Sequence, residues 1–199
     1  MKKEIIIAQD IDECLFNSVK KHYQELTKIG KKLGWTNLPT YEEVCLLGGT
    51  HGAYGKQTGY WEINEEMRNS SEFNQGLEPI EGSLEALTLL QSMLGIYLTT
   101  RPENLTLITE EELDEAGFPK REVVCRPKSI PLEHTTEWKL DVLRYLAQEK
   151  TATMIDDSMS LHNAILKAND PRIETVLFQG PMTPKGKGKT WKKIREELK

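Results

Sequence analysis

Short apolar runs alternate with amphipathic stretches along most of this chain, and this alternation limits the folds open to it. The runs are EIIIAQD (4–10), GIYLTT (95–100), EVVC (122–125), TATMIDD (151–157) and ETVLFQ (174–179). Amphipathic segments such as TEWKLDVLRYLAQ and SLHNAILKAN separate the later runs. This order is typical of a parallel sheet with helices on both faces. The sequence therefore predicts a Rossmann-like α/β fold with three layers and about five parallel strands.

A long segment separates the first two runs. Roughly 80 residues lie between them, against a few tens in a simple β-α-β unit. The stretch SVKKHYQELTKIGKKLGW reads as a long helix, and the glycine-rich stretch LLGGTHGAYGKQTGYW follows further helical pieces. We predict a core domain of residues 1–16 and 78–199, with a small, mainly helical cap inserted at 17–77.

The composition excludes several classes of protein. With 199 residues, 38% hydrophobic and 29% charged, the chain suits one core domain plus an insertion. A net charge of -5 argues against a nucleic-acid polymer as partner, since the one basic stretch, PKGKGKTWKKIR, is local and resembles a solvated helix end. The role of that stretch stays open.

The cysteines and the apolar segments indicate the cellular compartment in which the protein is expected. Cys14, Cys45 and Cys125 are widely spaced and form no C-x-x-C pair, so we expect neither a disulfide framework nor a zinc site. The first apolar run stops at Asp10, too soon for a signal-peptide core, and no apolar segment approaches the ~20 residues of a membrane helix. We expect a cytoplasmic protein without a membrane partner, either a monomer or a homodimer.

Polar side chains gather where the predicted strands end. The first run ends at Asp10 and Asp12, the second at Thr99, Thr100 and Arg101, and the fourth at Asp156 and Asp157. Ligands of an open parallel sheet bind beyond the carboxyl ends of its strands, so these groups should meet there. Four carboxylates at one edge repel one another unless a hard cation such as Mg²⁺ neutralises them. The alternative is that each aspartate merely caps the next helix, but helix caps need not gather at one edge.

Four motifs, taken in order, resemble those of the haloacid dehalogenase superfamily, specifically its phosphohydrolases. The first is an apolar strand followed by D-x-D, here IIIAQDIDECL, and the second is an apolar strand ending in Thr, here GIYLTTRPE. The third is a lysine opening a later helix, for which Lys139 in TEWKLDVL is the best candidate, and the fourth is a strand ending in paired acids, ATMIDDS. Each motif alone is weak, but together they span Asp10 to Asp157.

The resemblance implies a role for each motif residue. Asp10 corresponds to the nucleophile that forms an aspartyl-phosphate, and Asp12 to the general acid and base. The dehalogenases and cation-pumping ATPases of the superfamily lack an aspartate at the position of Asp12, which favours a phosphatase. Mg²⁺ is expected on the Asp10 carboxylate, the Asp12 backbone carbonyl and Asp157, with Asp156 close behind. The phosphate is expected to contact the Thr99 hydroxyl, the Thr100 backbone N–H and Lys139.

Some positions depart from the family pattern or leave alternatives. Glu13 and Cys14 replace the Gly-Thr or similar pair that is common after the second aspartate. Lys128 in CRPKSIP competes with Lys139 as the third-motif lysine. Arg101 either reaches the substrate or forms a surface pair with the inserted segment.

The predicted function is therefore Mg²⁺-dependent hydrolysis of a small phosphomonoester, either a metabolite or a nucleotide. The alternatives are a catalytically weak binding or regulatory protein and a phosphotransferase or mutase of the same superfamily. Substrate selection is expected in the cap, where the candidate side chains are His51, Tyr54, Lys56, Tyr60 and Trp61. The alternative is that these side chains only pack the cap.

Overall fold

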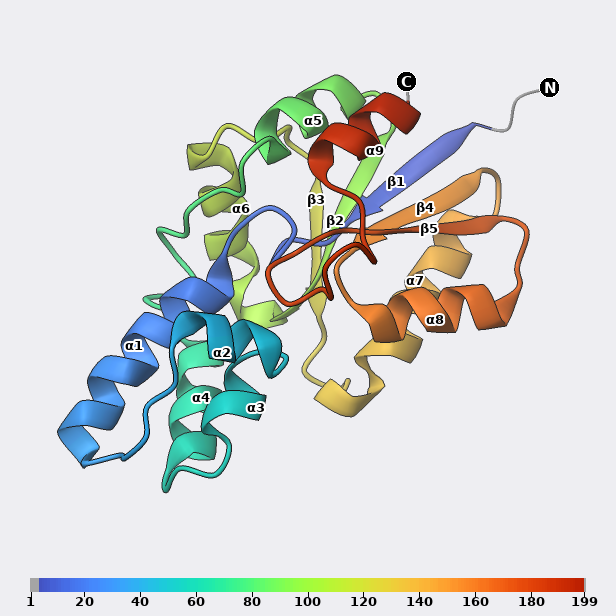
Figure 1. The fold of residues 1–199 in the computed structure, drawn as a ribbon. Helices are drawn as coiled ribbons and strands as arrows, with labels where there is room; N and C mark the ends of the chain where they lie inside the picture. Colours follow the sequence, from blue (N-terminus) through green and yellow to red (C-terminus); the bar gives the residue numbers. More distant parts are fainter. Residues whose placement is uncertain (1–3, 199) are drawn as a thin grey trace.

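The computed structural model describes residues 4–198 and contains one sheet of five parallel strands (Figure 1). The strands are β1 (Ile5–Gln9), β2 (Leu94–Pro102), β3 (Glu122–Arg126), β4 (Thr151–Asp156) and β5 (Ile173–Leu177). Their order in the sheet is β3-β2-β1-β4-β5, so β1 lies at the centre. The predicted runs and strands coincide closely, and the predicted parallel α/β sheet is confirmed.

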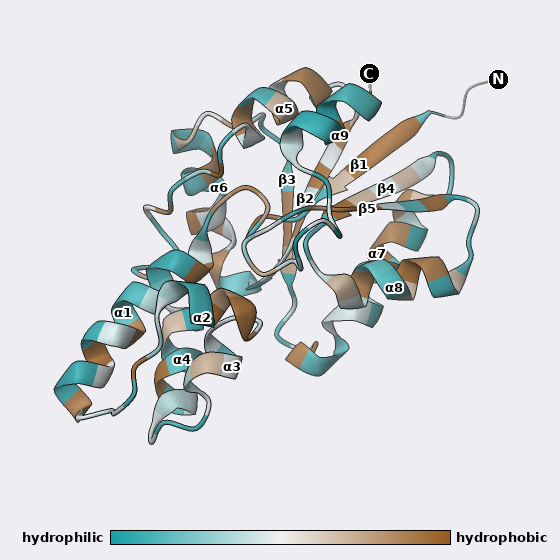
Figure 2. Cartoon of the chain, in the orientation of Figure 1, coloured by the Kyte–Doolittle hydropathy of each residue, from teal (hydrophilic) through white to brown (hydrophobic). Residues whose placement is uncertain are grey.

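Helices cover both faces of the sheet and make three layers. One face carries α5 (Ser83–Leu90), α6 (Thr106–Glu115) and α9 (Trp191–Glu197), and the other carries α7 (Thr135–Leu146) and α8 (Met159–Ala168). Short 3-10 helices at Glu103–Leu105 and Leu132–His134 precede α6 and α7. Figure 2 shows apolar strands between helices that are polar on their outer sides.

Alternation of side chains along β1 explains why both faces need cover. Successive residues of a strand point to opposite faces, so Ile7 joins the core beneath α5 and Ala8 the core beneath α7. Both side chains are fully buried. A parallel strand buried on both sides is therefore apolar along its whole length, as IIIA is.

Four helices lie between β1 and α5 and form what we term the helical segment, residues 17–77. They are α1 (Ser18–Leu33), α2 (Tyr41–Leu46), α3 (Thr50–Tyr54) and α4 (Tyr60–Asn69). The segment has its own hydrophobic cluster, which includes Leu26, Tyr54 and Tyr60. Met182, from the loop after β5, packs against that cluster and ties the segment to the core.

Local signals set the bounds of these helices. Asn17 caps α1 by accepting a hydrogen bond from the Lys20 backbone N–H, and Gly34 ends the helix in the left-handed region at φ 74°. Thr40 and Glu43 form a reciprocal capping box at the start of α2.

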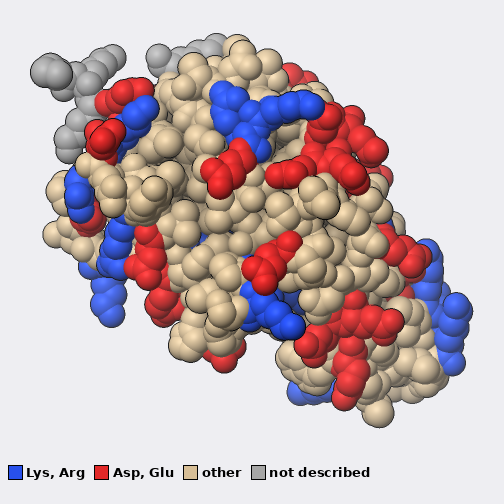
Figure 3. Space-filling model, turned by 180° about the vertical axis from the view of Figure 1, so that it is seen from behind, with Lys and Arg blue, Asp and Glu red and all other residues tan. Residues whose placement is uncertain are grey.

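Surface features agree with the composition. Within residues 4–198, no helix combines the length and the apolar character that crossing a membrane requires. Cys14, Cys45 and Cys125 are free thiols. The basic C-terminal stretch ends in α9, whose Trp191 and Ile194 are buried against the core while Lys192 and Lys193 face solvent. Acidic and basic side chains are interspersed over the face in Figure 3.

Candidate active site

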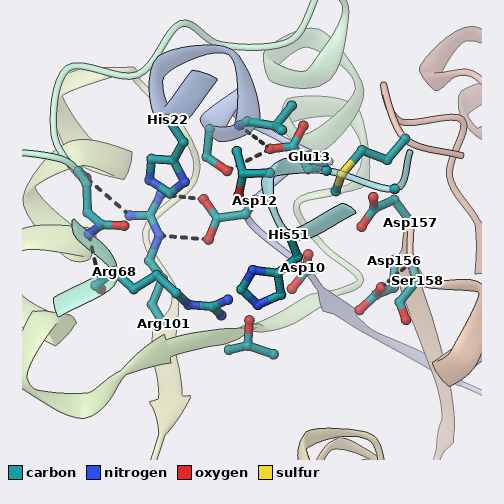
Figure 4. Close-up of a pocket in the computed structure, with 18 of the residues that line it drawn as sticks. Asp10, Asp12, Glu13, His22, His51, Arg68, Arg101, Asp156, Asp157 and Ser158 are labelled. Carbon is teal, nitrogen blue, oxygen red and sulfur yellow. Dashed lines mark hydrogen bonds and ion pairs between the residues drawn. The ribbon is translucent and has the colours of Figure 1, made fainter. Parts of the chain in front are cut away.

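The carboxyl ends of β1, β2 and β4 open into a pocket of about 340 Å³. The core lines it with Asp10, Asp12, Thr100, Arg101, Lys139, Asp156 and Asp157, among others, and the helical segment adds His22, Thr50, His51, Asn64 and Arg68. Figure 4 shows these groups converging from elements far apart in the sequence. The backbone N–H of Asp10 still donates to Ile155 of β4 at 3.0 Å, so the first aspartate is held at the edge of the sheet.

Lys139 joins two of the aspartates beneath the pocket. Its Nζ lies 2.6 Å from Oδ1 of Asp10 and 2.7 Å from Oδ2 of Asp156. Burial disfavours the charge of Lys139, but the two carboxylates outweigh burial and raise the pKa of its ammonium group. Lys128 is exposed and lines a different groove, so the structure brings Lys139 to the site and leaves Lys128 outside.

Asp10 and Asp157 form the part of the pocket best suited to a cation. Burial, followed by repulsion from Asp156, raises the pKa of both carboxyls well above the ordinary value. A ligand atom of each, together with Cys14 Sγ, lies within a group spanning 4.8 Å. Burial also raises the pKa of the Cys14 thiol, so the donors suited to a hard cation are the two carboxylates. This donor set fits Mg²⁺.

Asp156 is already occupied by protein contacts. Its Oδ2 accepts from Lys139, and its Oδ1 accepts from the Ser158 backbone N–H at 2.7 Å. The backbone at Gly180 packs closely against Glu13 and Asp157. A Cβ atom at this position would lie 2.8 Å from the Glu13 carbonyl oxygen and 3.2 Å from Asp157 Oδ2. These contacts make Asp156 the anchor of Lys139 and leave Asp157 facing the pocket.

Asp12 is held by a buried arginine. Arg101 donates from Nε and Nη2 to the two Asp12 carboxylate oxygens at 3.0 and 2.8 Å, and from Nη1 to Glu112 at 2.9 Å. Burial raises the pKa of Asp12, but the charge and hydrogen bonds of Arg101 outweigh burial and hold that pKa below its usual value. Glu112 is fixed in turn by the Leu77 backbone N–H at 3.0 Å.

Arg101 thus does not form the surface pair considered from the sequence, whereas its contact with substrate stays a prediction, since Arg101 lines the pocket. Its side chain is only 2% exposed and its charge is satisfied by two carboxylates. The predicted surface pair is wrong, because Arg101 pairs with the core residues Asp12 and Glu112 and meets the helical segment only through the Asn74 carbonyl oxygen at 3.4 Å. We assign Arg101 as a positioning residue for Asp12.

Of the two threonines that end the second motif, the structure places Thr100 in the pocket. Thr99 is fully buried outside the pocket lining, and its Oγ1 accepts from the Arg101 backbone N–H at 3.2 Å. The pairing of β2 with β3 is irregular between Thr99 and Pro102, and Thr100, Arg101 and Pro102 all line the pocket. Thr100 is therefore a further candidate for the hydroxyl near a bound phosphate, and the contact of Thr99 with phosphate stays a prediction.

The turn after Asp12 explains the departure at Glu13. Glu13 adopts φ 62°, a left-handed conformation in which glycine is the least strained residue. Its Oε1 accepts from the Ser18 hydroxyl at 2.6 Å and the Val19 backbone N–H at 2.7 Å, which ties the turn to the start of α1. Burial raises the pKa of Glu13 to about 7. Glu13 thus adopts a strained backbone conformation, and its side chain hydrogen-bonds the first residues of the helical segment.

Two histidines of the helical segment face the pocket in neutral form. Burial lowers the pKa of His22 to about 4, and burial followed by the charge of Arg68 lowers the pKa of His51. His51 Nδ1 lies 2.6 Å from the Tyr60 hydroxyl, which also donates to Asn64. His51, Tyr60 and Asn64 therefore form a hydrogen-bonded row of neutral groups in the helical segment.

The other candidates in the glycine-rich stretch lie away from the pocket. Tyr54 is fully buried, with its hydroxyl 2.8 Å from Thr27 Oγ1, so it packs the helical segment. Lys56 is exposed and outside the pocket lining. Trp61 is 55% exposed, contacts the His51 ring at a tilted angle with a centroid distance of 4.6 Å, and lines an adjoining groove. Of these side chains, His51 contacts the pocket and Tyr60 supports it.

Solved structures of other proteins have a fold similar to that of this chain. Neither a family model nor a curated protein matches the chain. Among solved structures, a haloacid dehalogenase-like hydrolase from Streptococcus pneumoniae covers 100% of both chains at TM-score 0.65 and 15% identity. A subfamily IA hydrolase of the superfamily from Geobacter sulfurreducens matches at TM-score 0.58 and 17% identity, covering 100% of this chain and 98% of its own. Protein Tyrosine Kinase A of Mycobacterium tuberculosis matches at TM-score 0.68 and 13% identity, covering 100% and 99%.

The chain has the haloacid dehalogenase-like fold. Within this fold, the motif residues predicted from the sequence meet at one edge of the sheet, and further residues complete the pocket. Sequence reasoning missed His22, Asn64, Arg68 and Glu112. One signal was present, because Tyr60, Asn64 and Arg68 are spaced four apart and so share a helix face. Nothing in the sequence indicated that this face meets the sheet edge.

Proposed function

We propose that this protein is a Mg²⁺-dependent phosphomonoester hydrolase that works through an aspartyl-phosphate on Asp10. The observation that carries the proposal is the pairing of Lys139 with Asp10 at 2.6 Å, opposite Asp157, with Asp12 two residues further along the same pocket. We also propose that residues 17–77 act as a cap, since helices of this segment supply one wall of the pocket.

In the first step, a carboxylate oxygen of Asp10 attacks phosphorus and forms a new O–P bond while the bond to the leaving oxygen breaks. Asp12 gives a proton to that oxygen, so the leaving group departs as an alcohol. Lys139, which keeps its positive charge, offsets the negative charge at the reacting oxygens. Thr100 faces the phosphate from the end of β2.

In the second step, water attacks the phosphorus of the aspartyl-phosphate and Asp12 takes its proton. The Asp10–phosphorus bond breaks, which releases inorganic phosphate and regenerates the carboxylate. Arg101 favours the ionised form of Asp12, so the free protein holds Asp12 ready as a base. The proton that Asp12 gives in the first step must therefore be taken up when the substrate binds, and a phosphomonoester that enters as its monoanion can supply it.

Asp10, Asp157 and the Asp12 backbone carbonyl are the groups expected to hold Mg²⁺. When bound, the ion would neutralise carboxylates that otherwise repel one another and would withdraw charge from the phosphate. Asp156 contributes indirectly, through its contact with Lys139.

The first prediction tests the function and the metal together. Phosphate release from a panel of phosphomonoesters is expected with Mg²⁺ and should stop in excess chelator. Mg²⁺ at about 100 times its dissociation constant should also stabilise the fold by about 2.7 kcal/mol, which raises the melting temperature by roughly 5–10 °C. Full activity in chelator would contradict the metal assignment, and a panel without any released phosphate would contradict the proposed function.

The second prediction isolates the proton transfer by Asp12. Asp12→Asn should slow phosphoenzyme formation by about 10²- to 10⁴-fold for an alkyl phosphate, whose leaving oxygen needs a proton. An aryl phosphate needs this proton far less and should be affected less. Rapid-quench measurement of the first step on both substrates provides the comparison, and equal losses on both would rule out the general-acid role.

Phosphoryl transfer to an acceptor other than water is the second candidate. It is favoured by the similar fold of the Mycobacterium tuberculosis protein, which is named a tyrosine kinase. Release of free phosphate from the panel in water supports hydrolysis, whereas release only when a hydroxyl acceptor is added supports transfer.

A further inference from the structure

Arg68 is a cation without a partner in the proposed active-site pocket. It lies in the last turn of α4, is half-buried, and extends into the pocket toward His51 (Figure 4). Among residues 4–198, its guanidinium forms neither an ion pair nor a side-chain hydrogen bond. Burial disfavours its charge and lowers the pKa of its guanidinium. A desolvated guanidinium without an anion is costly, so a ligand that supplies one is expected to bind there.

The neighbouring carboxylates cannot serve as its partner. Arg101 already occupies both oxygens of Asp12 and also pairs with Glu112. Asp10 and Asp156 are paired with Lys139. Glu13 accepts hydrogen bonds from the Ser18 hydroxyl and the Val19 backbone N–H, and Asp157 belongs to the proposed Mg²⁺ site, so each acid of this pocket already has another role.

The other side chains that the helical segment contributes to this pocket are neutral, while Glu65 and Glu103 lie with Arg68 in the adjoining groove and, among residues 4–198, neither forms an ion pair with it. The helical segment lines the pocket with Ser18, Val19, His22, Gly48, Gly49, Thr50, His51, Asn64, Arg68 and Asn74, none of which is acidic. His22 adds a second unsatisfied group, since its Nε2 is buried and has no partner within the described residues. The pocket thus has a core wall of carboxylates and Lys139, and an opposite wall of one cation with neutral donors.

We propose that Arg68 binds a second anionic group, carboxylate or phosphate, on the leaving group of the substrate. This inference rests on the proposed function, because the transferred phosphate is assigned to Asp10, Thr100 and Lys139. A pocket of about 340 Å³ lies at the small end of ligand sites, so the substrate class is a small phosphomonoester with two acidic groups. Arg68 then selects the leaving group, which the catalytic aspartates cannot distinguish.

The kinetic test uses three substrates of similar size: 2-hydroxyethyl phosphate, carboxymethyl phosphate and ethylene glycol bisphosphate. With Mg²⁺, the wild-type protein should prefer one of the two acidic substrates over 2-hydroxyethyl phosphate by about 10- to 100-fold in kcat/KM. Arg68→Gln should remove that preference, so that the ratio of kcat/KM for the preferred acidic substrate to kcat/KM for 2-hydroxyethyl phosphate falls to about 1. Which acidic substrate is preferred distinguishes a carboxylate from a phosphate.

The matched control is Lys31→Gln, which removes one positive charge from the exposed end of α1 in the same segment. It should keep the preference. A wild-type protein that hydrolyses all three substrates equally, or an Arg68→Gln variant that loses activity equally on all three, would overturn the role of Arg68 while leaving the proposed function standing.

A binding measurement separates this inference from hydrolysis. Calorimetric titration with Mg²⁺ compares three inert phosphonates: propylphosphonate, 3-phosphonopropionate and propane-1,3-bisphosphonate. One acidic compound should bind the wild-type protein about 10-fold or more tighter than propylphosphonate, and Arg68→Gln should abolish the difference. If this preference is found but no phosphomonoester is hydrolysed, the proposed function fails and the anion site stands. If no preference is found, the anion site is overturned.

Discussion

Replacing Asp10 by asparagine is expected to abolish turnover of every phosphomonoester that the wild-type protein hydrolyses. An amide oxygen is a poor nucleophile, so Asp10→Asn cannot form the aspartyl-phosphate. We expect kcat to fall by at least about 10⁴-fold. Because burial raises the pKa of Asp10, the folded protein disfavours its ionised form, and a neutral amide should not unfold the protein. Lys139 keeps Asp156 as its partner in this variant.

Two measurements separate loss of the nucleophile from loss of structure. Acid-quenched wild-type protein should carry a labelled phosphoryl group from substrate, and Asp10→Asn should carry none, at an unchanged or higher melting temperature. Asp141→Asn is the matched control, since Asp141 is exposed on α7 and pairs only with Arg144. Retention of more than about 1% of activity in Asp10→Asn would exclude Asp10 as the nucleophile.

Replacing Lys139 by methionine is expected to produce the largest loss of stability. Lys139 is buried and pairs with both Asp10 and Asp156, so its removal leaves two buried carboxylates without their cation. Breaking a buried pair in this way costs about 3–5 kcal/mol. For a chain of this size, the melting temperature should fall by roughly 6–20 °C, and turnover should be lost as well.

The pH dependence of this loss follows from the sign of the Asp10 shift. Burial raises the pKa of Asp10 in the folded state, and removing Lys139 raises it further, so the folded variant binds a proton more tightly than the unfolded chain. Its stability deficit should therefore be smallest near the ordinary carboxyl pKa of about 4 and should grow toward about pH 8. Mg²⁺ should recover part of the deficit by neutralising Asp10.

Urea unfolding of both proteins near pH 5 and pH 8, with and without Mg²⁺, measures this dependence. Lys128→Met is the control, because Lys128 is exposed and should change stability by less than about 0.5 kcal/mol. A deficit that is the same at both pH values would show that packing around Lys139, and not its charge, stabilises the fold.

Periodicity and strand-end residues were enough to predict the sheet. The run IIIA is apolar along its length and TATMID is buried along its length because a parallel strand is covered on both faces, and the short apolar run is a local signal. The confinement of Asp10, Asp12 and Asp156 to one edge followed as well, since all parallel strands end at the same side. The long helix after Asn17 was also visible from its amphipathic pattern and confirmed as α1.

Features that depend on the direction of a side chain could not be predicted from the sequence. Thr99 and Thr100 are chemically equivalent in the sequence, and only the structure shows that Thr100 lines the pocket while Thr99 is buried outside its lining. Tyr54 and Trp61 looked alike as candidates in the glycine-rich stretch. Packing within the helical segment buries Tyr54 fully and leaves Trp61 half exposed.

The sequence by itself determined the fold class, the edge where the chemistry gathers, and the aspartates that gather there, because each of these depends on patterns within a few residues. Only the tertiary structure decided which charges pair. Lys139 pairs with Asp10, which lies 129 positions away in the sequence, and Arg101 pairs with Asp12, which lies 89 positions away. Within residues 4–198, Arg68 pairs with no anion. Such pairings depend on how separate helices and strands pack against one another. Because charges interact through space, the spacing of the residues in the sequence does not predict which of them pair.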